Sequence, residues 1–243
     1  AEQARWRDVA AAFAKGELAP RVAEADRTET FPSDLVPRMG ALGLLAGPVD
    51  PALGGSGMDY VAFALVYQAL GEVDASMRGF LAVHGGLVTL CLRDHGSPEQ
   101  QRAWIPRLAS GEAIGCYCLT EPGAGSDAAA IATTAREQPD GGFVLDGRKT
   151  WITNGNLADV ALVFARDETL AADRPHRGIT AFVVPTREPG FVRLPMPGRP
   201  LGHRAADHAV IDLAGCRVPP GAVLGVRGGG FRVAMAALDH GRL

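Results

Sequence analysis

The residues best suited to chemistry lie in the stretch 115–130, which reads GCYCLTEPGAGSDAAA. Its first six residues are small, apolar or aromatic, and we expect them to form a buried strand. Glu121-Pro122 should end this strand, because proline cannot donate to a sheet. The following loop, residues 123–127, has almost no side-chain bulk, and Ser126 adds a hydroxyl. Backbone amides of such a loop can point at a bound anion, so the stretch predicts a site for a phosphorylated ligand.

The same stretch fits a second pattern, the dinucleotide-binding fingerprint G-x-G-x-x-G/A. Gly123, Gly125 and Ala128 match it, and Asp146 follows about 20 residues later, as the fingerprint requires. A plain glycine turn is a further interpretation of the loop alone. The fingerprint needs parallel strands joined by crossover helices. Here residues 131–135 and further strand-like segments follow the loop, so the sequence argues against a nicotinamide-binding fold.

Composition limits the classes of protein that the chain can belong to. The 243 residues are 47% hydrophobic and 21% charged, which is typical of a soluble globular protein. A net charge of −3 without a basic stripe argues against nucleic acid as a partner. We expect no membrane span, because no apolar run approaches the necessary length, and no signal peptide, because the N-terminus opens with charged residues and lacks an apolar core. The four cysteines predict reduced, buried thiols in a cytoplasmic protein, with no metal site.

The first domain, residues 1–112, is predicted to be helical throughout. Apolar residues at helical spacing predict helices at residues 2–15, 33–42, 60–70, 74–95 and 98–110. Ser33 is expected to cap the second helix, and Ser97 with Gln100 forms a capping box at the start of the last. The pair Gly85-Gly86 inside the fourth helix predicts close approach of another backbone or a ligand, or simple helix packing.

The second domain, residues 113–228, changes to an alternating pattern. Strands are predicted at residues 142–145, 149–153, 160–165, 179–184 and 208–213, and Asn154-Gly155 predicts a hairpin. We therefore expect an α+β protein in which the helical domain precedes an antiparallel barrel or sandwich. Residues 225–230 form a flexible joint to a last helical segment, residues 229–243. This helix has no C-cap, so we expect a further helical domain beyond Leu243.

Three segments together resemble the acyl-CoA dehydrogenase family over essentially the whole chain: CYCLTEPGAGSD at residues 116–127, KTWITNG at 149–155 and GGGFRVAMAALDHGRL at 228–243. The resemblance implies an FAD-dependent enzyme that removes an α-proton and a β-hydride from an acyl thioester. It also implies a C-terminal helical bundle, of which only the first helix is present here. An electron-transfer flavoprotein or a similar acceptor would take the electrons, and the protein would be a homodimer or homotetramer.

The resemblance also assigns residues to the cofactor and the substrate. The cofactor-binding residues would be Tyr117, Leu119, Thr120, Gly125, Ser126, Trp151, Ile152 and Thr153. Thr120 would meet the polar edge of the flavin, Trp151 would pack against one face, and Thr153 would hydrogen-bond near N5. Ser126, Asp239 and Arg242 would line the substrate site.

The catalytic base is expected outside this chain. In most members of the family it is a glutamate of the C-terminal bundle, beyond Leu243. In the isovaleryl-type branch it directly precedes the arginine that matches Arg242, but Gly241 stands there in this sequence and cannot abstract a proton. Glu121, the one carboxylate between residues 115 and 126, is interpreted as a structural partner at the turn.

Several alternatives stay open at this point. Residues 74–84 resemble dehydrogenases acting on acyl groups bound to a carrier protein in extender-unit pathways, and also the glutaryl-type branch. The thioester could therefore be presented by CoA or by an acyl carrier protein. A flavin oxidase or monooxygenase on the same scaffold, and a non-catalytic partner subunit, are the other classes.

Overall fold

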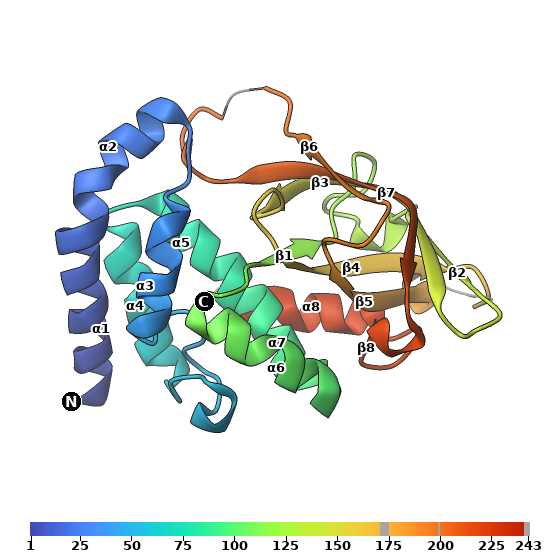
Figure 1. Cartoon of the computed structure of the whole chain (residues 1–243), viewed down its shortest axis with the longest axis horizontal. Helices are drawn as coiled ribbons and strands as arrows, with labels where there is room; N and C mark the ends of the chain where they lie inside the picture. The colour runs from blue at the N-terminus through green and yellow to red at the C-terminus, as the bar shows by residue number, and fades with distance from the viewer. Residues whose placement is uncertain (171–174, 199, 241–243) are drawn as a thin grey trace.

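The computed structural model describes residues 1–170, 175–198 and 200–240. A helical region lies beside a region built on a sheet, as Figure 1 shows. The helices of the first region are α1 (Glu2–Phe13), α2 (Ala19–Thr28), α3 (Val36–Ala41), α4 (Tyr60–Gly71), α5 (Ala75–Leu81), α6 (Leu90–His95) and α7 (Pro98–Ser110). Wider π-helical turns join α1 to α2 (Ala14–Leu18) and α5 to α6 (Ala82–Thr89).

The helix starts follow the capping chemistry of the sequence, with one exception. The predicted capping box is confirmed, because Gln100 N donates to Ser97 Oγ at 3.2 Å and Ser97 N donates to Gln100 Oε1 at 3.0 Å. The cap predicted at Ser33 is wrong. Ser33 already lies inside a 3₁₀ turn (Ser33–Leu35), and α3 begins only at Val36 without a side-chain cap.

The run from α5 through the π-helical turn to α6 is one continuous helical segment. By its 21-residue length and mean hydropathy of 1.3, Ala75–His95 could cross a membrane, contrary to our expectation that no apolar run is long enough. However, 67% of its apolar window is buried inside the protein, as in the core helix of a globular fold. A Cβ on Gly85 would lie 2.6 Å from the Leu45 carbonyl oxygen, which confirms the predicted close backbone approach.

The second region is a single eight-stranded sheet. Its strands are β1 (Gly115–Cys118), β2 (Thr134–Glu137), β3 (Phe143–Thr153), β4 (Val160–Asp167), β5 (Ile179–Pro185), β6 (Phe191–Pro195), β7 (His208–Val218) and β8 (Val223–Leu224). Their order is β6-β7-β3-β2-β4-β5-β8, and β1 also pairs with β4. The predicted α+β class is confirmed. The sheet is mixed rather than wholly antiparallel, because β1 and β2 both run parallel to β4.

The Asn154-Gly155 turn is present, but the hairpin predicted there is wrong. β3 pairs with β2 and β7, whereas β4 pairs with β1, β2 and β5, so the two strands flanking the turn are not partners. Asn154 adopts the left-handed φ of 65° that its residue type tolerates. Its Nδ2 donates to the carbonyls of Phe80 (3.3 Å) and Gly115 (3.2 Å), so the turn joins the helical region to β1.

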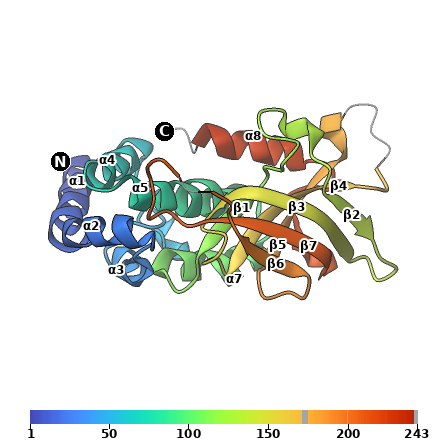
Figure 2. The ribbon, with the colours of Figure 1, turned by 90° about the horizontal axis from the view of Figure 1, so that it is seen from above.

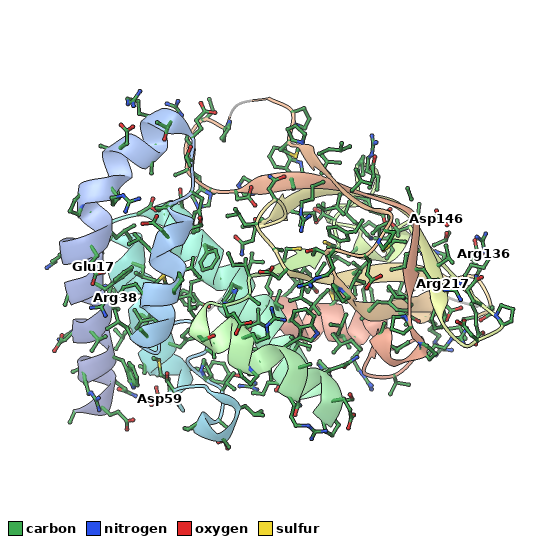
Figure 3. All side chains as sticks on the ribbon, viewed as in Figure 1. Glu17, Arg38, Asp59, Arg136, Asp146 and Arg217 are labelled. Carbon is green, nitrogen blue, oxygen red and sulfur yellow. The ribbon has the colours of Figure 1, made fainter. Side chains whose placement is uncertain are left out.

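The last helix, α8 (Gly230–His240), packs against β5 and the Ala82–Thr89 segment. Figure 2 shows it lying along one side of the sheet. One apolar cluster fills the helical region, a second fills the sheet region, and a third joins α8 to β1, β4 and the α5–α6 segment. On the surface, Figure 3 shows Arg38 facing Glu17, whose carboxylate lies 3.0 Å from the Arg38 Nε. All four cysteines are buried free thiols.

Candidate active site

A cavity of about 530 Å³ lies where the helical region, the sheet and α8 meet. We call it the main cavity. Its walls are mostly apolar, and the hydroxyls of Thr120, Ser126 and Thr153 bring polar groups to it. The lining residues are Val83, Leu87, Tyr117, Leu119, Thr120, Gly125, Ser126, Asp127, Ala128, Ala129, Trp151, Thr153, Phe231, Met235 and Leu238. An apolar pocket with a few convergent polar groups is the usual form of a small-molecule or cofactor site.

β1 supplies one wall of the main cavity and fixes α8 against it. The Tyr117 ring lies 4.9 Å from that of Phe164, and its hydroxyl donates to the Ala234 carbonyl at 3.3 Å. Burial raises the pKa of Tyr117 well above its ordinary value, so the phenol stays neutral. The strand and the helix are therefore joined at one corner of the cavity.

The end of β1 is held by a buried ion pair. Lys149 of β3 is fully buried, and its ammonium donates to Glu121 Oε1 (2.7 Å) and to the carbonyls of Phe164 (2.7 Å) and Leu119 (3.2 Å). These partners use all three ammonium donors. Burial alone would raise the pKa of Glu121, but the Lys149 charge and hydrogen bonds hold that pKa below its usual value.

Glu121 also holds the glycine loop in place. Its carboxylate accepts the backbone N–H groups of Ala132 (2.6 Å) and Thr133 (3.0 Å) beyond the loop. Its own backbone exchanges two hydrogen bonds with Ala124, at 3.0 and 3.1 Å, which makes a tight turn. The predicted role of Glu121 as a structural partner agrees with these contacts.

The glycine loop leaves free space on the cavity side. A Cβ on Gly125 would meet nothing within 4 Å, and neighbouring Ser126 is exposed. The Thr120 carbonyl accepts the Thr150 N–H at 2.9 Å, and Thr120 lines the cavity. The loop is thus an open cradle rather than a packed turn.

Trp151 is turned out of β3 by an irregularity in the strand. The register with β7 shifts between Lys149 and Ile152, and Trp151 lies between them with a φ of 56°. This left-handed conformation costs a non-glycine residue roughly 1–2 kcal/mol. A bulge of this kind re-aims a side chain. As a result the indole is 59% exposed and lines the main cavity.

Thr153, at the end of β3, faces the same cavity and contacts His208, the first residue of β7. The Thr153 Oγ1 lies 3.2 Å from the His208 Nδ1. His208 itself lines a second cavity of about 540 Å³, which Trp151 also lines. This second cavity lies between residues 29–33 of the helical region and the β6–β7 connection.

Most of the predicted cofactor residues converge on the main cavity: Tyr117, Leu119, Thr120, Gly125, Ser126, Trp151 and Thr153. Ile152 does not line it, because its side chain is 1% exposed and packs inside the sheet region. Asp239 is exposed near the end of α8 and is not among the lining residues. Arg242 lies outside the described residues.

Sequence reasoning missed several residues that shape the site. Val83 and Leu87 line the cavity from the π-helical turn. The one signal in the sequence that could have identified them is their apolar character in a helix that contains a glycine pair. His208 had no motif of its own. Its contact with Thr153 depends on the register between β3 and β7, in which these two residues pair.

The residues present fit a flat heteroaromatic cofactor with a polar edge. The exposed Trp151 indole offers a stacking surface, and Thr120 and Thr153 offer hydroxyls. The space left at Gly125 allows a phosphate group to approach the backbone. These are the features that a flavin dinucleotide requires.

Comparison with known proteins agrees with this geometry. The model of the acyl-CoA dehydrogenase N-terminal domain matches residues 1–112, and that of the middle domain matches residues 116–216. The human mitochondrial short-chain specific acyl-CoA dehydrogenase is 41% identical over 231 residues, which are 95% of this chain and 55% of that protein. This chain therefore spans little more than half the length of that relative.

Two solved structures have the same fold. A glutaryl-CoA dehydrogenase from Mycobacterium smegmatis in complex with FADH2 has a TM-score of 0.91 and 35% identity, over 99% of this chain and 59% of that one. A chain in a structure of the electron transferring flavoprotein of Acidaminococcus fermentans has a TM-score of 0.93 and 33% identity, over 99% and 62%.

Proposed function

Since the chain belongs to the acyl-CoA dehydrogenase family, we propose that the full-length protein is an FAD-dependent dehydrogenase of acyl-CoA thioesters. One observation carries the proposal. The main cavity is apolar along its helical walls, and an exposed indole and a glycine cradle, with three hydroxyls, lie at its sheet side. The apolar acyl chain of a thioester would contact the helical walls. A flavin would contact the indole, the glycine loop and the hydroxyls at the sheet side.

The sheet side of the cavity is proposed to hold the cofactor. When bound, FAD supplies an acceptor for the two electrons that leave the substrate. Trp151 would pack against the ring system, while Thr120 and Thr153 would offer hydrogen bonds to its polar atoms. Gly125 and Ser126 would receive the pyrophosphate and the pantetheine arm. Lys149 and Glu121 would keep these groups in position without touching the ligand.

The helical side of the cavity is proposed to hold the acyl chain. Val83 and Leu87 from one helical segment face Met235 and Leu238 from α8 around the same space. These side chains can exclude water and bind a hydrocarbon chain, but they offer no partner to a second carboxylate. We therefore favour a simple acyl group over a glutaryl group as substrate.

The proton-abstracting base is not assigned to Glu121, whose carboxylate is occupied by Lys149 and two backbone N–H groups. A base located after Leu243 stays a prediction, as do an electron-transfer flavoprotein as acceptor, a homo-oligomer and a cytoplasmic location. Presentation of the acyl group by a carrier protein is the alternative to CoA.

The test uses the protein expressed from its complete gene, held without oxygen and followed by visible absorption. A panel of acyl-CoA and acyl-carrier-protein thioesters is added to the flavin-loaded protein. Loss of the flavin absorption with one CoA thioester would support the dehydrogenase and name its substrate. A yellow protein that no thioester reduces would point to an oxidase-like function, and a protein that cannot be loaded with FAD would contradict the proposal.

A further inference from the structure

His208 does not line the main cavity, but it contacts the hydroxyl group of Thr153, which does. Thr153 lines that cavity, and its Oγ1 lies 3.2 Å from the Nδ1 of His208. The imidazole stands edge-on to the Trp151 indole, with ring centroids 6.4 Å apart. A titratable group thus lies directly behind two of the side chains to which we assign flavin contacts.

We propose that His208 is a positioning residue: its protonation decides whether the Thr153 hydroxyl donates or accepts a hydrogen bond inside the main cavity, so that FAD binding is coupled to proton uptake by His208. This inference rests on the function proposed above.

The coupling follows from the single proton of a threonine hydroxyl. When the Nδ1 of His208 carries no proton, Thr153 donates its only proton to that nitrogen and presents an acceptor to the cavity. When the Nδ1 carries a proton, His208 donates to the Thr153 oxygen, and the hydroxyl proton is free to point into the cavity. N5 of an oxidised flavin is an acceptor without a proton, so it requires the second arrangement.

The surroundings of His208 favour its neutral form in the absence of a ligand. Partial burial, followed by the nearby His203, lowers the pKa of His208, and Asp207 opposes this shift. The two imidazole centroids are 5.9 Å apart. Arg204 and Glu29, which line the same second cavity, are paired with each other at 2.9 Å. A neutral His208 that carries its proton on Nε2 gives the first arrangement. A ligand that needs a donor from Thr153 then favours protonation of the Nδ1, which raises the pKa of His208.

The segment that carries His208 is held firmly enough to keep this geometry. The Asp207 carboxylate accepts from the backbone N–H and the amide of Asn156, at 2.8 and 2.6 Å. His203 is anchored to α5 by a 2.6 Å hydrogen bond between its Nε2 and the Ala75 carbonyl. The chain on the N-terminal side of His208 is thus tied both to the turn after β3 and to the helical region.

The experiment measures FAD affinity at about pH 5.5 and about pH 8, on either side of the ordinary histidine range, with the flavin-free full-length protein. We expect binding to be about three- to tenfold tighter at the lower pH, the value of one hydrogen bond. His208→Asn and Thr153→Val should both remove this difference. His208→Asn also controls for other titrating groups, because it leaves them unchanged.

Histidine NMR gives a readout that does not depend on activity. We expect the pKa of His208 to be higher in the protein loaded with oxidised FAD than in the flavin-free protein. It should stay unchanged with 5-deaza-FAD, in which a C–H group replaces N5. In Thr153→Val, FAD should no longer raise it.

The outcomes separate this inference from the proposed function. If FAD binds but its affinity and the pKa of His208 are independent of each other, the inference is wrong and the proposed function stands. A neutral His208 that carries its proton on Nδ1 at high pH would also overturn the inference. If the protein binds no FAD at either pH, the proposed function is wrong and the inference falls with it.

Discussion

The Lys149 ammonium lies 2.7 Å from the Glu121 carboxylate, and the Lys149 side chain is completely removed from solvent. The pair joins β3 to the end of β1, where the wall of the main cavity begins. Neither side chain lines the cavity. The pair is therefore a structural support behind the residues that contact the ligand.

Replacing Lys149 should destabilise the protein strongly. Lys149→Met leaves the Glu121 carboxylate buried without its counter-charge, which costs about 3–5 kcal/mol of unfolding free energy. Urea denaturation of the full-length protein measures this loss. The control is Arg148→Met, one residue away, which removes an exposed pair with Asp212 and should cost far less, because water screens that pair. Equal effects of the two substitutions would contradict the support role.

Trp151→Ala should weaken FAD binding more than it weakens the fold. The indole is mostly exposed, so its removal takes little from the core. Alanine has the same cost in the left-handed conformation, so the substitution leaves the backbone strain unchanged. Loss of a stacking partner should reduce FAD affinity by about tenfold. Flavin fluorescence quenching measures the affinity, and thermal unfolding of the flavin-free protein measures the fold. Unchanged affinity would remove Trp151 from the cofactor site.

The glycine loop offers a matched pair of substitutions. A Cβ meets nothing within 4 Å at Gly123 or at Gly125, but only Gly125 lines the main cavity. Both changes to alanine should leave the flavin-free protein as stable or more stable, by up to about 1 kcal/mol. Gly125→Ala alone should reduce FAD affinity, because the methyl group occupies the space proposed for the ligand. If Gly123→Ala weakens FAD binding equally, the space beside Gly125 is not the site of the ligand.

His84 makes the fold sensitive to acid. It is fully buried, its Nε2 lies 3.0 Å from the Leu108 carbonyl, and its Nδ1 accepts the Gly115 N–H at 3.3 Å. Burial lowers the pKa of His84 to about 4. The unfolded chain, with an ordinary pKa, binds a proton first as the pH falls. Unfolding free energy should therefore fall between about pH 6.5 and pH 4, by roughly 3 kcal/mol in total.

His84→Gln tests this dependence, because glutamine can still donate and accept but does not titrate. Urea denaturation at several pH values should show a shallower loss of stability in the variant than in the wild-type protein. Identical pH profiles would show that His84 is not the responsible group.

The sequence predicts local chemistry well where the partners are close in the chain. The capping box of Ser97 and Gln100 needed only four residues, and the glycine loop after β1 was recognisable from composition. Prediction from the sequence failed where contacts with residues far apart in the chain determine the local structure. Asn154-Gly155 has the residues of a hairpin, yet the Asn154 amide binds backbone of α5 and β1, and the chain crosses to a non-neighbouring strand.

The same limit applies to the candidate site. The motif around Trp151 and Thr153 placed both near the cofactor, and both line the main cavity. Neither the outward turn of Trp151 nor the contact of Thr153 with His208 could be derived from it. Both depend on the irregular register between β3 and β7, which is a property of two strands far apart in the chain.

The main cavity is assembled from segments that leave the ribosome at different times. Val83 and Leu87 come first, the strands follow, and Phe231, Met235 and Leu238 of α8 come last. Until α8 emerges and Tyr117 can bond to Ala234, the apolar wall has no cover. Contacts of such long sequence separation form late in folding. The nascent chain therefore presents a hydrophobic surface that chaperones can bind, and the cofactor can be enclosed only after synthesis has passed α8.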